Sequence, residues 1–214
     1  TDAWLKEDGI SPIDYLILTH YDRDHIGGAV ALLRFYDVEM IYYPDYVSEK
    51  KYYEGLMAEL SGRENAVCVS EDVAFETGEL HVDVIPAEDP TAIIAADEKI
   101  DNNLSLLCMM TYNAKKFFFA GDIEENRIGQ LLDSEHDLSA EWIKMPHHGS
   151  YASNYKDFLD RVNPVYAVIS TSLEEAPKKK LLKLLNKREI FFFDTMESNV
   201  TTFCDGASVT IKND

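Results

Sequence analysis

Cysteines, positive charges and long apolar segments are all scarce in this chain, and each shortage excludes a class of protein. Its 214 residues include three cysteines, Cys68, Cys108 and Cys204, which are widely spaced. This pattern does not fit the disulfide framework of a small secreted domain, so we expect the cysteines to act as small buried hydrophobic residues. No apolar run reaches the roughly 18 residues that a membrane-spanning helix needs. The composition therefore indicates a globular protein with a substantial core.

Basic residues are outnumbered, with 20 Lys and Arg against 39 Asp and Glu and a formal net charge of −19. Nucleic acids bind proteins mainly through basic side chains that neutralise phosphates. The balance therefore disfavours tight binding of long polyanions, except where metals or a local basic patch reverse the field. The main basic concentration lies in residues 178–188. We interpret it as the solvated face of an amphipathic helix, with a phosphate-facing patch as the alternative.

Strand-like and helix-like segments alternate without a repeat or a boundary, so we predict one domain over residues 1–214. Strands are predicted at 13–18, 39–43, 66–69, 73–75, 80–85, 104–111, 117–120, 142–145, 165–170, 190–193, 200–203 and 208–211. Helices are predicted at 26–36, 48–61 with Ser48 as its cap, 123–132, 155–162 and 177–186. Residues 86–100 are predicted to be a loop. Periodicity alone thus indicates an α/β or α+β protein.

A short polar segment holds four possible metal ligands. They are His20, Asp22, Asp24 and His25. Two imidazoles and two carboxylates so close together indicate a divalent cation, because such clusters commonly form metal sites. The predicted strand 13–18 ends just before them and Gly27–Gly28 follow, so the ligands lie on a turn between a strand and a helix. A solvated polar turn is the alternative interpretation.

Later segments place polar residues of the same kind at strand ends. The apolar run 117–120 leads into Gly121-Asp122, and 143–146 leads into His147-His148-Gly149-Ser150. With the segment Asn102–Leu107, these blocks resemble the metallo-β-lactamase superfamily, whose first motif is His-x-His-x-Asp-His. Asp22 at its third position and the following Ile-Gly-Gly are similar to the hydrolase domain of the ComEC-like DNA-uptake group. The resemblance runs over most of the chain.

This resemblance implies a fold and a set of ligands. The fold is a four-layer αββα sandwich, and because relatives carry strands before the first motif, we expect this chain to lack those N-terminal strands. Two divalent ions are implied, with His20 and Asp22 at the first and Asp24 and His25 at the second. Asp122 would bridge the two ions. Either His147 or His148 would complete the second site.

The chain departs from the usual superfamily pattern at the first ion. A histidine normally occupies the position of Asp22, and another normally precedes the bridging aspartate, where Asn102 and Asn103 lie here. We interpret His81 as structural because it lies well upstream. An oxygen-rich first site favours Mn²⁺ or Mg²⁺ over tight Zn²⁺ binding. We therefore expect two ions, Mn²⁺ or Zn²⁺, one of them weakly bound.

The resemblance implies hydrolysis by a metal-bound hydroxide. Asp24 would orient the water or take its proton, and His148 would donate a proton to the leaving group. Ser150 and Asn103 are candidate substrate contacts. We favour a phosphodiesterase or nuclease-like enzyme acting on a small phosphoester or single-stranded nucleic acid. The alternatives are a hydrolase of a small ester, phosphoester or amide, and a non-enzymatic binding module with a weak metal site.

Two further features have interpretations of their own. His136 lies in a polar stretch and is expected at the surface. Five tyrosines are expected to pack against the sheet edge, with a base-stacking wall as the alternative. They are Tyr42, Tyr43, Tyr46, Tyr52 and Tyr53. The sequence leaves the compartment and the oligomeric state open.

Overall fold

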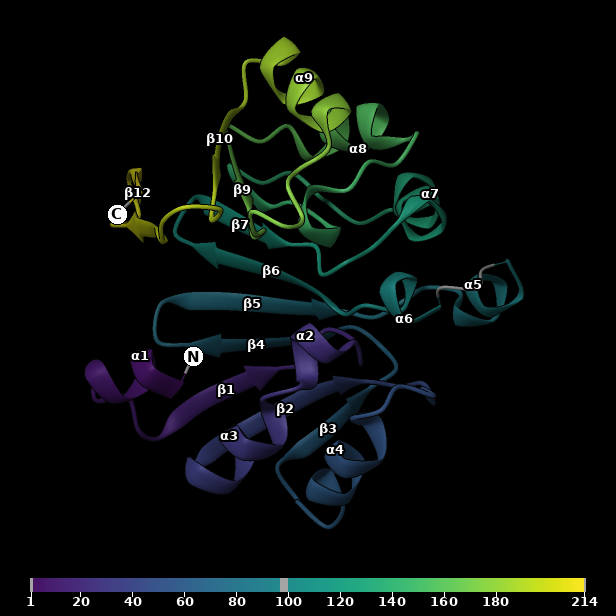
Figure 1. Ribbon diagram of the computed structural model, residues 1–214, viewed down its shortest axis with the longest axis vertical. Helices are drawn as coiled ribbons and strands as arrows, with labels where there is room; N and C mark the ends of the chain where they lie inside the picture. The colour runs from purple at the N-terminus through teal and green to yellow at the C-terminus, as the bar shows by residue number, and fades with distance from the viewer. Residues whose placement is uncertain (1, 97–99, 214) are drawn as a thin grey trace.

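The computed structural model describes residues 2–96 and 100–213, which form two larger β-sheets, a β-hairpin and flanking helices (Figure 1). The strands are β1 (Ile13–Ile17), β2 (Val38–Pro44), β3 (Ala66–Val69), β4 (Val73–Thr77), β5 (Leu80–Ile85), β6 (Leu107–Tyr112), β7 (Lys115–Phe119), β8 (Trp142–Lys144), β9 (Tyr166–Ile169), β10 (Phe191–Asp194), β11 (Val200–Cys204) and β12 (Val209–Asn213). β1–β3 form a parallel sheet. The second sheet has the order β10-β9-β8-β7-β6-β5-β4.

The helices are α1 (Asp2–Glu7), α2 (Arg23–Ile26), α3 (Ala29–Phe35), α4 (Tyr53–Leu60), α5 (Pro90–Ala96), α6 (Ile100–Asn103), α7 (Glu125–Asp133), the 3₁₀ turn η1 (His147–Gly149), α8 (Tyr155–Val162) and α9 (Lys179–Lys187). Helices cover the outer faces of the two sheets, with α3 and α4 on the first and α7, α8 and α9 on the second, while the other helices lie at the ends of the strands (Figure 1). Among the described residues, none of these helices has the length and apolarity that crossing a bilayer requires.

Three apolar cores hold these layers together. Leu33 of α3 and Leu56 of α4 pack on Ile41 of the first sheet. The two sheets meet through a core that contains Val69 and Val84. The largest core lies between the second sheet and α7, α8 and α9. The order of layers is therefore helix, sheet, sheet, helix (Figure 1), which confirms the predicted αββα sandwich.

The β11–β12 hairpin covers part of the second sheet that the first sheet leaves uncovered. Val209 of β12 packs with Trp142 and Val168, and the partly buried Phe117 joins this cluster. The inner face of the second sheet is thus shared between β1–β3 at one end and the hairpin at the other. This arrangement explains why so many aromatic residues lie on β7 and its neighbours.

Some predicted elements differ from the structure. The predicted loop 86–100 contains the helix α5, which buries Ile93. The predicted helix 48–61 begins only at Tyr53, because Ser48 is buried and donates a 2.6 Å hydrogen bond to Asp101 instead of capping the helix. Cys108 is buried as expected, whereas Cys68 is exposed. At Ser48 a contact with a residue far along the chain outweighs the local pattern.

Backbone hydrogen bonds bring three loops to one edge of the sandwich. The amide of Leu106 donates to Thr19 across the two sheets (2.8 Å), and the amide of His147 donates to Gly121 (3.4 Å). Gly121 has a φ of +55°, and a Cβ there would lie 2.7 Å from the Cβ of Ser105. Only glycine fits this turn, which directs the following residue, Asp122, toward the first loop.

Candidate metal centre

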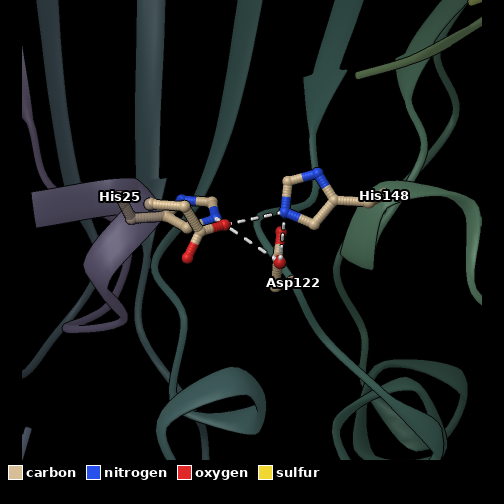
Figure 2. Close-up of side chains that lie close together, drawn as sticks. His25, Asp122 and His148 are labelled. Carbon is tan, nitrogen blue, oxygen red and sulfur yellow. Dashed lines mark hydrogen bonds and ion pairs between the residues drawn. The ribbon is translucent and has the colours of Figure 1, made fainter. Parts of the chain in front are cut away.

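Four side chains from three segments converge at this edge. Asp24 and His25 belong to α2, Asp122 follows β7, and His148 lies in η1. One possible ligand atom from each lies within 4.8 Å of the others. Figure 2 shows His25 and His148 on either side of Asp122. Two imidazole nitrogens and two carboxylate oxygens at this spacing suit a single divalent cation.

Asp122 is at the centre of the group and is only 3% exposed. Its Oδ2 lies 3.2 Å from His148 Nε2 and 3.4 Å from His25 Nε2. Burial would raise the pKa of Asp122, but hydrogen bonds from the two histidines and the charge of Lys144 outweigh it and hold that pKa well below its usual range. The buried carboxylate is therefore an anion that needs positive charge around it.

A backbone carbonyl fixes the orientation of His148. Its Nδ1–H donates to the carbonyl of Ser170 at 2.7 Å, so its Nε2 faces Asp24 Oδ2 at 2.9 Å and Asp122. Metal-bound histidines are commonly held in this way through the other ring nitrogen. Hydrogen bonding to Asp122 raises the pKa of His148 to about 9, so this ring is protonated at neutral pH when no cation is present.

Thr19 orients the two histidines of the first motif. Its Oγ1 lies 3.1 Å from His20 Nδ1 and 3.2 Å from His25 Nδ1. The two rings are 3.9 Å apart between centroids. Burial and, to a smaller extent, the nearby His25 lower the pKa of His20 to about 3, so His20 is neutral at physiological pH. Its Nε2 is buried without a hydrogen-bond partner among the described residues.

Two lysines contact carboxylates of the predicted ligand set. Lys50 Nζ lies 2.6 Å from Asp22 Oδ1. Lys144 Nζ lies 3.2 Å from Asp122 Oδ1 and also donates to the carbonyl of Gly121. Asp22 is thus paired with a lysine and lies outside the four-residue group. Neither lysine is among the predicted site residues, although Lys144 is a charged residue within an otherwise apolar strand.

His147 and Asn103 take other partners. His147 Nδ1 pairs with Glu124 Oε1 at 2.7 Å, so of the two adjacent histidines only His148 joins the group. Asn103 is fully buried, and its Oδ1 accepts hydrogen bonds from the amides of Glu124 and Arg127. It therefore caps the first turn of α7, which speaks against the predicted contact with substrate.

The remaining predicted residues lie away from the group. His81 pairs with Glu76 and Asp83 on the second sheet, in keeping with a structural role. His136 is half-buried against Glu88 rather than fully at the surface. The five tyrosines pack in the two cores that flank the first sheet, as expected.

Three hollows border the group, one at His148, one at Asp24, and one at Asp24 and His25. A cavity of about 870 Å³ contains His148 and Ser150 in its lining, together with the segments 174–176 and 178–180. A smaller hollow of about 340 Å³ is lined by Asp22, Arg23, Asp24, Lys50, Lys51 and Tyr52. Asp24 and His148 touch each other, so the candidate metal centre has one member in the lining of each of these two hollows, and both carry lysines. The third hollow, of about 580 Å³, is mostly apolar and is lined by Asp24, His25 and residues of α3.

Comparisons with known proteins agree with this geometry. The family described as "Metallo-beta-lactamase superfamily" matches residues 2–172. The ComE operon protein 3 of Bacillus subtilis (strain 168) is 32% identical over 195 residues, which are 87% of this chain and 24% of that protein. The chain therefore spans about a quarter of the length of this relative.

Solved structures share the fold. Igni18, described as a novel metallo hydrolase from the archaeon Ignicoccus hospitalis KIN4/I, has a TM-score of 0.56 at 15% identity, covering 89% of this chain and 79% of its own. The metallo-beta-lactamase fold protein YhfI from Bacillus subtilis has a TM-score of 0.53 at 12% identity, covering 99% and 84%. At these identities the likeness concerns the fold alone.

Proposed function

The chain belongs to the metallo-β-lactamase superfamily, and from this premise we propose that it is a metal-dependent hydrolase of phosphodiesters. The cation, Mn²⁺ or Zn²⁺, would be held by Asp24, His25, Asp122 and His148. A bound divalent cation lowers the pKa of water and polarises a phosphoryl oxygen. The second, weaker ion expected from the resemblance would have to use His20 and Asp22, whose surroundings are less complete.

The observation that carries this proposal is that each of two lysine-bearing hollows has a member of the centre in its lining. A phosphodiester has two ester substituents, and both need space when the phosphate lies at the reacting centre. The hollow beside His148 and the hollow beside Asp24 offer that space on two sides. A phosphomonoester would need only one of them. The larger hollow also has a volume typical of small-molecule sites.

The side chains at the centre have distinct roles in this proposal. Asp24 is the most exposed of the four, with a side chain 58% exposed, and would orient the attacking water. His148 is charged at neutral pH in the metal-free protein and faces the larger hollow. There it would bind the cation or donate a proton to the leaving oxygen. Ser150 lines the same hollow and would hydrogen-bond a phosphate oxygen.

The charges around the hollows favour short or flexible substrates. Lysines line both hollows and attract phosphate, but the larger one also contains Glu124, Glu125, Glu174 and Glu175. The net charge of −19 adds a repulsive field for a long polyanion. We therefore propose a small diester or a single strand as substrate, with duplex DNA disfavoured.

A second function is favoured by the same acidic lining. Glutamates next to lysines also suit a small ester, phosphoester or amide that carries little net charge. A binding module with a weak metal site is the non-enzymatic alternative. It would retain cation binding without turnover of any of these substrates.

Hydrolysis assays separate these possibilities. The metal-loaded protein is given bis(p-nitrophenyl) phosphate, p-nitrophenyl phosphate, single-stranded DNA and duplex DNA. We expect the diester to be cleaved faster than the monoester, and single strands faster than duplex. Preference for the monoester would contradict the argument from two hollows. Bound metal without any turnover would favour the binding module.

A further inference from the structure

The two carboxylate oxygens of Asp122 have different partners. Oδ2 faces His25 and His148, whereas Oδ1 lies 3.2 Å from the ammonium of Lys144. An aspartate that bridges two cations through both of its oxygens gives one oxygen to each. Here the second oxygen is already neutralised by a cation that belongs to the chain.

The fold holds Lys144 in this place. β8 runs parallel to β7 with Lys144 paired to Phe119, three residues before Asp122. The lysine side chain is 17% exposed, and its Nζ also donates to the carbonyl of Gly121 at 3.2 Å. A second contact to the same turn fixes the ammonium more firmly than one surface ion pair would.

The other ligands of a second cation are also engaged. Asp22 Oδ1 is paired with Lys50 at 2.6 Å, and the Asn103 oxygen accepts two backbone hydrogen bonds. His20 supplies the one remaining nitrogen. Divalent ions need several ligands, and oxygen-preferring ions need carboxylates above all. The residues around His20 therefore do not fit a second tightly bound ion.

We propose that this protein binds one divalent cation, at Asp24, His25, Asp122 and His148, and that the Lys144 ammonium replaces a second cation on Asp122. Lys50 plays the same part more loosely at Asp22, since its side chain is 46% exposed. This inference rests on the proposed function only in placing a cation at the four-residue group. Lys144 is thus a positioning residue that holds Asp122 Oδ1 and completes the charge of the site.

Counting bound metal tests this directly. Equilibrium dialysis against Mn²⁺ with elemental analysis is run on the wild type, Lys144→Met, Lys144→Arg and the double variant Lys50→Met/Lys144→Met, after circular dichroism has verified folding. We expect one ion in the wild type, with the EPR signal of an isolated Mn²⁺. Lys144→Met should bind that ion at least about tenfold more tightly, because a nearby positive charge is removed.

The other variants sharpen the result. The double variant frees both carboxylate oxygens and should bind a second ion, whereas Lys144→Arg retains the charge and should match the wild type. If the double variant does not fold, the difference in Mn²⁺ affinity between Lys144→Met and the wild type tests the proposal by itself. Two tightly bound, exchange-coupled ions in the wild type would overturn the proposal. So would equal affinities in the wild type, Lys144→Met and Lys144→Arg.

The metal count is independent of hydrolysis. A protein that binds one ion but cleaves no phosphodiester would refute the proposed function and leave this inference standing. A protein that cleaves phosphodiesters with two bound ions would refute this inference alone. A protein that binds no ion would contradict the metal centre and both proposals with it.

Discussion

The side of Asp122 that faces His148 differs from the side that faces Lys144 in the kind of positive charge it can accept. On the first side, His25, His148 and Asp24 offer ligand atoms to a cation from solution. On the second side, lysine ammonium groups already contact Asp122 and Asp22. Both arrangements neutralise carboxylates, but only a cation from solution can dissociate and bind again. In the single-ion proposal, the motif keeps half of a metal site and ion pairs replace the other half.

Removing the shared carboxylate should have the largest effect. Asp122→Ala takes away the buried anion that His25, His148 and Lys144 all contact. We expect cation affinity to fall by more than about 100-fold, because losing even an outer hydrogen-bond partner of a ligand costs 10–100-fold. Hydrolysis of a diester should be nearly abolished.

Isothermal titration calorimetry with Mn²⁺ measures this loss, and circular dichroism verifies that the fold is retained. Asp122→Asn is the matched control, since it keeps the shape and removes the charge. It should behave like Asp122→Ala. A variant that still held a stoichiometric ion would exclude Asp122 as a ligand.

Variants on each side of Asp122 test the comparison itself. His148→Ala removes a ligand of the proposed ion, so we expect its affinity to fall by about 100-fold. Asp22→Ala removes a carboxylate that Lys50 already neutralises, and its effect on the same affinity should stay within about tenfold. Calorimetry on both variants gives the ratio. Equal losses would mean that the two sides hold metal alike.

Asp22→His tests the same comparison by introducing a nitrogen ligand instead of removing a ligand. It restores an imidazole on the lysine side and should shift ion preference from Mn²⁺ toward Zn²⁺, because nitrogen ligands favour Zn²⁺. Competition dialysis with both ions measures the preference. A preference unchanged from the wild type would show that ligand type at this position does not matter.

The pH dependence of cation binding should be moderate and of definite sign. The pKa of His148 is raised to about 9, so below that pH a cation must displace its proton. Apparent affinity should therefore rise about tenfold per pH unit up to about pH 9. For the metal-free protein the sign is opposite. The ion pair of His148 with Asp122 stabilises fully below the unfolded histidine pKa of about 6.5 and is lost as the pH rises through 9.

Calorimetry across pH and thermal unfolding of the metal-free protein check these two trends. His81→Ala is the control, because His81 pairs with Glu76 and Asp83 away from the centre. It should leave the pH dependence of binding unchanged. An affinity that is flat between pH 6 and 9 would contradict a proton on His148.

The smallest expected effect concerns the lysines of α9. Lys179 and Lys180 line the larger hollow, whereas Lys183 and Lys187 are exposed on the same helix outside that lining. Replacing Lys179 and Lys180 with Met should weaken cleavage of single-stranded DNA several-fold and reduce its salt dependence, while a small diester is spared. The pair Lys183→Met/Lys187→Met is the matched control. Equal effects of both pairs would make α9 a purely structural helix.

The sequence predicted the local part of the centre and much of the fold. The motif from His20 to His25 was recognisable because its ligands lie within one turn, and the alternation of strands and helices follows from apolar periodicity. The main failure in the fold was α5, because residues 86–100 were predicted to be a loop, whereas residues 90–96 form a helix that buries Ile93. The predicted start of the helix 48–61 was wrong because Ser48 donates a hydrogen bond to Asp101, far along the chain, instead of capping the helix.

What the sequence by itself determined is the chemistry available: the acidic charge, the imidazoles and carboxylates, and the strand-end positions from which they act. The tertiary structure decided which of them meet. It brings His148 into contact with Asp24, whereas the adjacent His147 pairs with Glu124. It also brings Lys144 to Asp122 across parallel strands. Periodicity fixes which face a residue lies on, but contacts between distant segments depend on strand pairing and turn geometry that only the folded chain sets.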